Sequence, residues 1–197
     1  MPKRIGIYAG TFDPVHVGHI AFALQAMQAA QLDWVYFLPE RRPRGKQGVE
    51  HFGHRVAMLR KAALPHPQFG VLELPDIDFS VQRTLPRLKK QFTEQQLVFL
   101  MGSDVVQQLP NWPHNEQLLT ECELVIGVRN GQTSSELKQA ITTWSQTPKA
   151  ITMFESYAPQ VSSQKVRAAL LKQQHTQGLL TSVQRYSNEH WLYVSLA

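Results

Sequence analysis

The sequence predicts a doubly wound α/β fold, with a parallel sheet covered by helices on both faces, and three observations support this. Short runs of apolar, β-branched and aromatic residues alternate with helical patterns along the whole chain. These runs are apolar on both faces, as in parallel strands buried on both sides. The length of 197 residues suits one domain. We therefore expect residues 1–197 to form a single domain whose last part, from about 160 onward, is helical.

The expected elements alternate in the order that such a sheet requires. Strands are expected at 4–9, 34–38, 69–74, 97–101, 124–128 and 150–155. Helices are expected at 19–31, 52–64, 80–92, 103–119 with breaks, 134–144, 162–173 and 182–189. Pro86 should kink or shorten the third helix. Ligands of such sheets bind at the carboxyl ends of the strands, so the loops after the first, second and fourth strands are the candidate site.

Composition narrows the class of protein. Hydrophobic residues make up 43% and charged residues 18%, which excludes a disordered chain. The single cysteine, Cys122, cannot form an internal disulfide, so we expect a cytoplasmic protein. The longest apolar runs fall far short of the ~18 residues of a membrane span, and the N-terminal apolar stretch is too short for a signal peptide. A net charge of +5 favours an anionic partner such as a nucleotide.

Part of the positive charge is concentrated in one segment, at Arg41, Arg42, Arg44 and Lys46. The pattern suits a solvated loop as well as a loop that faces phosphates. Because the segment has no aromatic residue and no second cluster accompanies it, we do not expect nucleic acid as a partner.

The turn after the first strand is the strongest functional signal. Gly10 allows a sharp turn and close approach of a ligand, and Thr11 offers a hydroxyl group. Gly18 and His19 open the following helix, whose N-terminus attracts anions. His16 and His19 can both point at the same anion. Two histidines at this spacing also fit metal ligation or helix caps.

Two further segments carry candidate site residues. At 102–104, Gly-Ser-Asp ends the fourth strand, where Asp104 suits ribose hydroxyls; a helix cap is the structural alternative. At 161–167, Ser162 or Ser163 can cap the last long helix. Arg167 lies in its first turn, where positive charge opposes the helix dipole unless an anion is present.

These motifs resemble a known family. The run from Gly10 to His19 resembles the signature of the nucleotidyltransferase superfamily that shares its H-x-G-H motif with class I aminoacyl-tRNA synthetases. It is most similar to bacterial nicotinate-mononucleotide adenylyltransferases, and the segments at 109–112, 128–131 and 161–167 follow in that family's order. The resemblance implies a Rossmann-like fold. It also implies adenylyl transfer from ATP to nicotinate mononucleotide, giving nicotinate adenine dinucleotide and pyrophosphate in NAD biosynthesis.

The resemblance assigns roles to particular residues. It implies ATP binding by Gly10, Thr11, Phe12, Gly18, His19, Gly102, Asp104, Ser162, Ser163 and Arg167. Charge neutralisation and catalysis would fall to His16, His19, Lys46 and Arg167. The acceptor would contact Asp13, Lys46, Phe79, Ser80 and Trp112, with Trp112 stacking on the pyridine ring unless it is a core aromatic. Mg²⁺ is expected as the cofactor, held mainly by the ATP phosphates and without a protein metal site.

The chain departs from the family pattern in the acceptor half. The family's Pro-Pro-His-Lys is Pro-Arg-Gly-Lys at 43–46, and its Ser-Tyr-Thr-x-Asp-Thr-Leu segment is altered at 78–85. Backbone N–H groups near Ser80 and after Trp112 are expected to bind the nicotinate carboxylate. The departures leave open another acceptor (nicotinamide mononucleotide or phosphopantetheine), a cytidylyl transfer, or a non-catalytic nucleotide-binding paralogue. Neither a membrane nor an oligomeric state is indicated.

Overall fold

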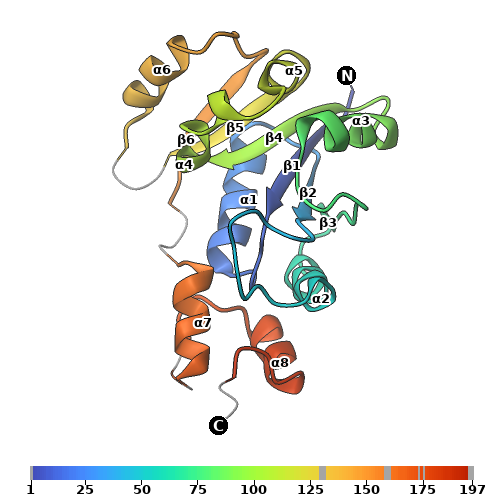
Figure 1. The fold of residues 1–197 in the computed structure, drawn as a ribbon, viewed down its shortest axis with the longest axis vertical. Helices are drawn as coiled ribbons and strands as arrows, with labels where there is room; N and C mark the ends of the chain where they lie inside the picture. The colour runs from blue at the N-terminus through green and yellow to red at the C-terminus, as the bar shows by residue number, and fades with distance from the viewer. Residues whose placement is uncertain (1, 129–131, 158–160, 173, 175, 195–197) are drawn as a thin grey trace.

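The computed structural model describes residues 2–128, 132–157, 161–172, 174 and 176–194, and its centre is a six-stranded sheet (Figure 1). Every neighbouring pair of strands is parallel, in the order β3-β2-β1-β4-β5-β6. This is the strand order of a doubly wound Rossmann-like sheet, so the predicted fold class is confirmed. The strands are β1 (Arg4–Gly10), β2 (Trp34–Pro39), β3 (Phe69–Val71), β4 (Gln96–Gly102), β5 (Glu123–Val128) and β6 (Ile151–Glu155).

Helices cover both faces of the sheet. One face packs against α1 (Val17–Ala29), α2 (Phe52–Ala63) and α8 (Thr181–Glu189). The other packs against α3 (Val81–Gln91), α4 (Ser103–Val106), the 3₁₀ turn Leu109–Asn111, α5 (Asn115–Glu121) and α6 (Ser134–Thr142). Helix α7 (Ser163–Leu171) lies with α8 at the end of the molecule where the chain terminates (Figure 1).

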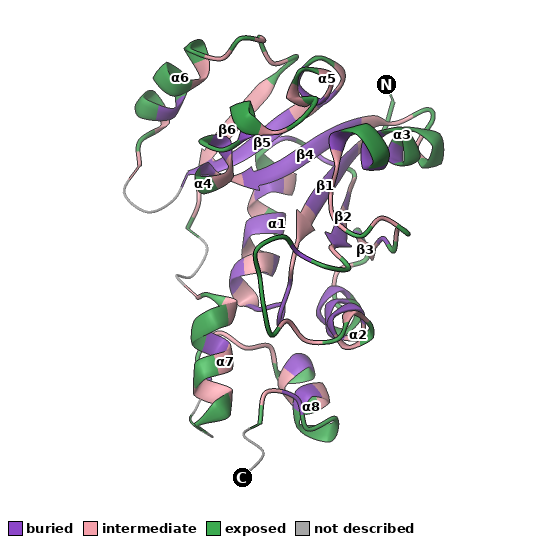
Figure 2. Ribbon diagram, viewed as in Figure 1, coloured by how far each residue is buried: buried purple, intermediate pink, exposed green. Residues whose placement is uncertain are grey.

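The core explains why the strands have apolar residues on both faces. In β4, Phe99 and Met101 belong to one buried cluster, whereas Val98 and Leu100 belong to the other. The central strands are accordingly buried along most of their length (Figure 2). Within the described part of the chain, no helix is both long and apolar enough to cross a bilayer.

Two elements differ from the sequence prediction, and a third has the breaks that were expected. Helix α3 continues past Pro86 to Gln91, so the proline does not end it. The breaks expected within 103–119 divide that stretch into α4, the 3₁₀ turn and α5, because Pro110 and Pro113 lack the N–H groups that would continue a helix. Strand β3 ends at Val71, and the chain then turns toward the loop after β2, where Arg41 Nε donates to the Leu74 carbonyl at 2.9 Å.

Candidate active site

A continuous cleft lies at the carboxyl ends of β1 and β4, the point where the strand order reverses. It consists of three adjoining cavities that share Thr11 and Lys46. The central cavity, about 320 Å³, runs between β1 and β4. The aromatic cavity, about 260 Å³, contains Phe79 and Trp112, and the basic cavity, about 560 Å³, contains His16 and Arg167.

The cleft brings together residues that the sequence predicted separately. The central cavity is lined by Gly10, Thr11, Phe12, His19, Lys46, Phe79, Gly102, Asp104 and Trp112 among others. Ser80 lines the aromatic cavity. The basic cavity includes Asp13, His16, His19, Lys46, Asp104, Ser162, Ser163 and Arg167. Gly18 lines none of the three cavities and is buried in the first turn of α1.

The β1–α1 turn is shaped by Phe12. Its backbone adopts a φ of 49°, a left-handed conformation that non-glycine residues rarely adopt. The ring is buried, and it meets the His19 ring in a T-shaped arrangement at a centroid distance of 5.0 Å. A Cβ on Gly10 would lie 3.0 Å from the Phe12 ring, so any larger residue there would press against that ring. Phe12 therefore supports the turn from within the core while one side of the ring borders the cleft.

The two histidines at the start of α1 form one unit. His16 is the N-cap residue, and its backbone N–H donates to His19 Nδ1 at 3.2 Å. The rings stack with centroids 3.7 Å apart. Because Nδ1 of His19 accepts a hydrogen bond, the proton of the neutral ring is on Nε2, which makes that nitrogen a donor. The capping and ligand-facing interpretations of this pair are thus compatible.

The helix N-terminus offers fewer donors than the sequence indicated. The Val17 N–H donates to the Gly178 carbonyl at 2.9 Å, and the His19 N–H donates to the His16 carbonyl at 3.0 Å. Two N–H groups of this helix start are thus engaged within the chain, and the expectation that it attracts an anion stays a prediction.

Lys46 places a cation at the junction of the three cavities. Its Nζ donates to Thr11 Oγ1 at 2.8 Å, which joins the loop after β2 to the turn after β1. On the other side of the cleft, Gly102 ends β4 and precedes α4, whose first turn contains Asp104. The Asp104 side chain lines both the central and the basic cavity.

The aromatic cavity has two ring walls. The Phe79 and Trp112 rings lie 5.8 Å apart at an angle of 50°. The predicted backbone donors near Ser80 are already engaged: the Phe79 N–H donates to Glu40 Oε1 at 3.3 Å, and the Ser80 N–H donates to Thr84 Oγ1 at 3.1 Å. The residue directly after Trp112 is Pro113, which has no N–H group to donate. The expectation that N–H groups near Ser80 bind a carboxylate does not agree with these contacts.

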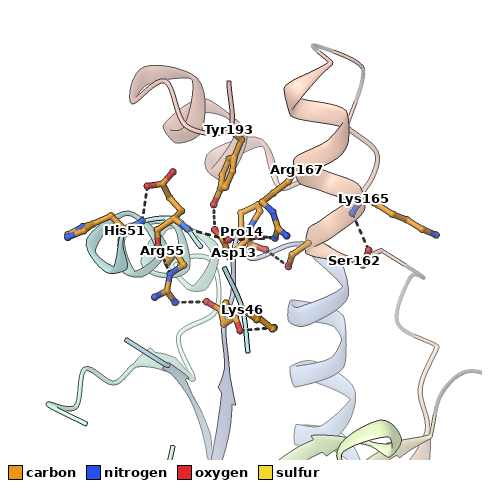
Figure 3. A network of polar contacts seen from close by, with 12 residues as sticks. Asp13, Pro14, Lys46, His51, Arg55, Ser162, Lys165, Arg167 and Tyr193 are labelled. Carbon is orange, nitrogen blue, oxygen red and sulfur yellow. Dashed lines mark hydrogen bonds and ion pairs between the residues drawn. The ribbon is translucent and has the colours of Figure 1, made fainter. Parts of the chain in front are cut away.

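Asp13 is the centre of a buried polar network (Figure 3). Its side chain, 1% exposed, accepts a hydrogen bond from the Tyr193 hydroxyl at 2.6 Å and a longer one from the Glu50 N–H at 3.4 Å. Arg167 Nη1 lies 3.6 Å from the Asp13 carboxylate and donates to its carbonyl at 2.5 Å. Asp13 lines the basic cavity and not the aromatic one, which differs from the expectation that it binds the acceptor.

The C-terminal motif is fastened to the same turn. Ser162 is the N-cap of α7 and accepts from the Lys165 N–H at 3.2 Å, while the Ser163 hydroxyl donates to the Pro14 carbonyl at 2.9 Å (Figure 3). The positive charge of Arg167 at the start of α7 has an anion within the chain, Asp13. The anion that the helix start requires is thus supplied within the chain, and Arg167 also lines the basic cavity.

Sequence reasoning missed Arg55, which organises the loops of the cleft. Its side chain is completely buried, and burial lowers its pKa below the usual value. The guanidinium donates to the carbonyls of Thr11 at 2.7 Å, Glu40 at 2.8 Å, Glu50 at 2.9 Å and Arg41 at 3.0 Å. One side chain of α2 thus holds the turn after β1 and both ends of the loop after β2.

Among the described residues, no group of three or more His, Cys, Asp or Glu side chains is arranged to hold a metal ion. The predicted Arg129–Gly131 part of the family motif lies outside the described residues.

The fold and the cleft define a nucleotidyltransferase. Residues 7–169 match the cytidylyltransferase-like family model, so the chain belongs to that family. A nicotinate-nucleotide adenylyltransferase of Bacillus subtilis is 32% identical over 98% of this chain and 100% of its own length. The chain therefore belongs, within the family, to the group of proteins related to nicotinate-nucleotide adenylyltransferases.

Solved structures agree on the fold. A nicotinic acid mononucleotide adenylyltransferase of Plasmodium falciparum, complexed with NaAD, superimposes with a TM-score of 0.79 at 19% identity and covers 97% of each chain. The same enzyme complexed with APC gives a TM-score of 0.77 at 18% identity, again over 97% of each chain.

Proposed function

We propose that this protein transfers the adenylyl group of ATP to nicotinate mononucleotide, giving nicotinate adenine dinucleotide and pyrophosphate for NAD biosynthesis. The observation that carries the proposal is the continuous cleft, with cations at one end, aromatic rings at the other and Thr11 with Lys46 between them. The charges suit a triphosphate, and the rings suit a planar heterocycle. The relatives' function and the complete coverage of the Bacillus subtilis enzyme support the same reaction.

The basic cavity would hold the triphosphate of ATP. His16, His19 and Arg167 line it, and Lys46 lies where it meets the other two cavities. Adenosine would lie in the central cavity, with its ribose hydroxyls toward Asp104. The ring of the acceptor would stack on Trp112, with Phe79 as the second wall.

Adenylyl transfer depends more on the alignment of the two substrates than on proton transfer by the protein. A phosphate oxygen of the acceptor attacks the α-phosphorus of ATP, the bond between that phosphorus and the bridging oxygen breaks, and pyrophosphate leaves with the electron pair. The acceptor phosphate has a second pKa of about 6 and is already a dianion at neutral pH, so it needs no general base. The enzyme must align two anions that repel each other and neutralise their charge.

We propose Mg²⁺ as the cofactor. When bound with ATP, it would neutralise charge on the triphosphate and on the departing pyrophosphate. The donor set of the basic cavity fits an ion held by phosphate oxygens. Asp13 is already paired with Arg167 and Tyr193, which leaves Asp104 as the other carboxylate lining that cavity. The cytoplasm, which supplies ATP, is the compartment we propose for the reaction.

A pyrophosphate-release assay tests the proposal. The purified protein is given ATP or CTP with nicotinate mononucleotide, nicotinamide mononucleotide or phosphopantetheine, with and without Mg²⁺. We expect the highest kcat/KM for ATP with nicotinate mononucleotide, and no turnover without the metal. Faster use of another acceptor or of CTP would replace the proposed substrate pair. Absence of turnover with every pair, despite ATP binding, would establish a non-catalytic nucleotide-binding protein.

A further inference from the structure

The aromatic cavity has two cationic side chains among its lining residues, Arg44 and Lys46. Lys46 is committed to the junction of the cavities by its 2.8 Å hydrogen bond to Thr11, next to where the phosphates must meet. Arg44 lines the aromatic cavity and neither of the other two. The two cations are therefore separated in space along the acceptor, one toward its phosphate and the other toward its ring.

Arg44 is held in place by Asp78, which directly precedes the lining residue Phe79. Its Nε donates to Asp78 in a close ion pair, and Arg83 contacts the other oxygen of Asp78 at 2.9 Å. The Arg44 guanidinium holds the pKa of the Asp78 carboxyl below its usual value, so Asp78 remains an anion at neutral pH. The neighbouring Arg42 N–H donates to the Ile77 carbonyl at 2.7 Å, which fastens the backbone of the two segments.

The Asp78 contact uses one donor of Arg44. A guanidinium has five N–H groups in a planar fork. Within the described part of the chain, the hydrogen bond from Nε to Asp78 is the one that the Arg44 side chain makes. Its terminal nitrogens therefore retain the capacity to bind a second carboxylate.

Two backbone donors beside Arg44 are engaged, and a carboxylate also lines the cavity. The N–H groups of Phe79 and Ser80 donate to Glu40 and Thr84. The Glu40 carboxylate also lines the cavity, where it would repel a negatively charged ring substituent. A ligand with a ring carboxylate therefore needs a cation nearby that outweighs Glu40.

We infer that Arg44, held by Asp78, binds the carboxylate on the pyridine ring of the acceptor and thereby selects nicotinate over nicotinamide mononucleotide. The inference rests on the proposed function and names the residue that determines its acceptor. A guanidinium binds a carboxylate by charge-assisted hydrogen bonds, whereas the amide of nicotinamide presents a neutral oxygen and an NH₂ donor. Glu40 has the opposite effect, since its carboxylate accepts a hydrogen bond from that NH₂ group.

The test compares two arginines that share one partner. Arg44→Ala and Arg83→Ala each remove one positive charge and one contact to Asp78, but only Arg44 lines the cleft. For each protein, kcat/KM is measured with both acceptors at saturating ATP, and the melting temperature is recorded. We expect Arg44→Ala to lower the preference for nicotinate by about 10- to 100-fold, the scale of hydrogen bonds to a charged group, through a higher KM for nicotinate mononucleotide.

One control variant and two further variants test whether the effect on acceptor preference is specific to Arg44. Arg83→Ala should leave the acceptor preference within about threefold of wild type, because Arg83 contacts Asp78 without lining the aromatic cavity. Arg44→Lys should keep part of the preference, because the charge remains without the planar fork. Glu40→Gln should raise the preference for nicotinate. An unchanged preference in Arg44→Ala, or an equal loss in Arg83→Ala, would overturn the inference.

A binding measurement separates this inference from the proposed function. Nicotinate mononucleotide and nicotinamide mononucleotide are titrated calorimetrically into wild type and Arg44→Ala without ATP. If no acceptor is turned over, the proposed function fails. Selective loss of nicotinate mononucleotide binding in the variant would still support Arg44 as the carboxylate-binding residue, and equal binding by the two proteins would refute it.

Discussion

Tyr193→Phe isolates a single hydrogen bond that closes the network around Asp13. The hydroxyl of Tyr193 donates to Asp13 Oδ1 at 2.6 Å, and the carboxylate is 1% exposed. Phenylalanine keeps the ring and its packing, so the change removes one donor from a buried anion without opening a large cavity. Asp13 keeps its contacts with Arg167 and the Glu50 N–H.

The expected cost follows from the charge of the acceptor. A hydrogen bond to a charged group contributes about 1.5–3 kcal/mol to stability. For a chain of this size, each kcal/mol changes the melting temperature by about 2–4 °C. The variant should therefore melt roughly 3–12 °C below wild type at neutral pH.

The pH dependence gives a second, independent signature. Burial, with the hydrogen bond and the charge of Asp13, raises the pKa of the Tyr193 hydroxyl in the folded protein. The pKa of an unfolded tyrosine is about 10. Below about pH 10 the hydroxyl is protonated in both states, and its contribution to stability is complete. Above that pH the unfolded chain loses the proton first, so the contribution declines.

The assay is urea unfolding of wild type and variant from pH 7 to 11. The difference in unfolding free energy should be constant to about pH 9.5 and then shrink, because phenylalanine has no proton to lose. Tyr186→Phe is the matched control, since it removes another tyrosine hydroxyl near the C-terminus, one that pairs with His54 Nδ1 at 3.0 Å. A stability difference below about 0.5 kcal/mol, or one that grows at high pH, would refute the reasoning.

Three other changes test separate parts of the structure. His19→Ala should keep the fold and lower kcat by about 10²–10³-fold, the scale for losing one preorganised donor to the transition state; turnover within threefold of wild type would contradict it. Arg55→Met should lower stability by at least about 3 kcal/mol in urea unfolding, because it leaves backbone carbonyls without their buried donor; a loss under 1 kcal/mol would exclude that role. Burial raises the pKa of Cys122 to about 12, so a thiol reagent at pH 8 should modify it only in denaturant; rapid labelling of the native protein would show an accessible thiol.

The sequence predicted best those features that depend on residues within one short segment. Strands such as β4 are apolar on both faces because each face meets a helix layer, and this pattern is visible without tertiary information. The turn from Gly10 to His19 has its glycines, histidines and helix start within one segment. The location of the cleft follows from the strand order, which the alternation of strands and helices already favours.

Local sequence patterns do not predict contacts between segments that lie far apart in the chain. Arg167 looked unpaired at its helix start because its partner, Asp13, lies 154 positions earlier. Nothing local distinguishes Arg55 from Arg60 on the same helix, yet the first is completely buried and the second is largely exposed. Likewise, the two departures from the family pattern contact each other through Arg44 and Asp78, a pairing that neither segment indicates alone.

The hydrogen bond between Tyr193 and Asp13 can form only at the end of protein synthesis. The two residues are 180 positions apart, so the hydroxyl leaves the ribosome long after the carboxylate that it binds. At translation rates of about 5–20 residues per second, the delay is roughly 10–40 s. Throughout that interval Asp13 lacks its shortest hydrogen bond, although strands β1 to β6 have all been synthesised before the interval ends. All six strands are therefore synthesised before the residue that completes the Asp13 network, and a fusion that displaces Tyr193 would leave Asp13 without its shortest hydrogen bond.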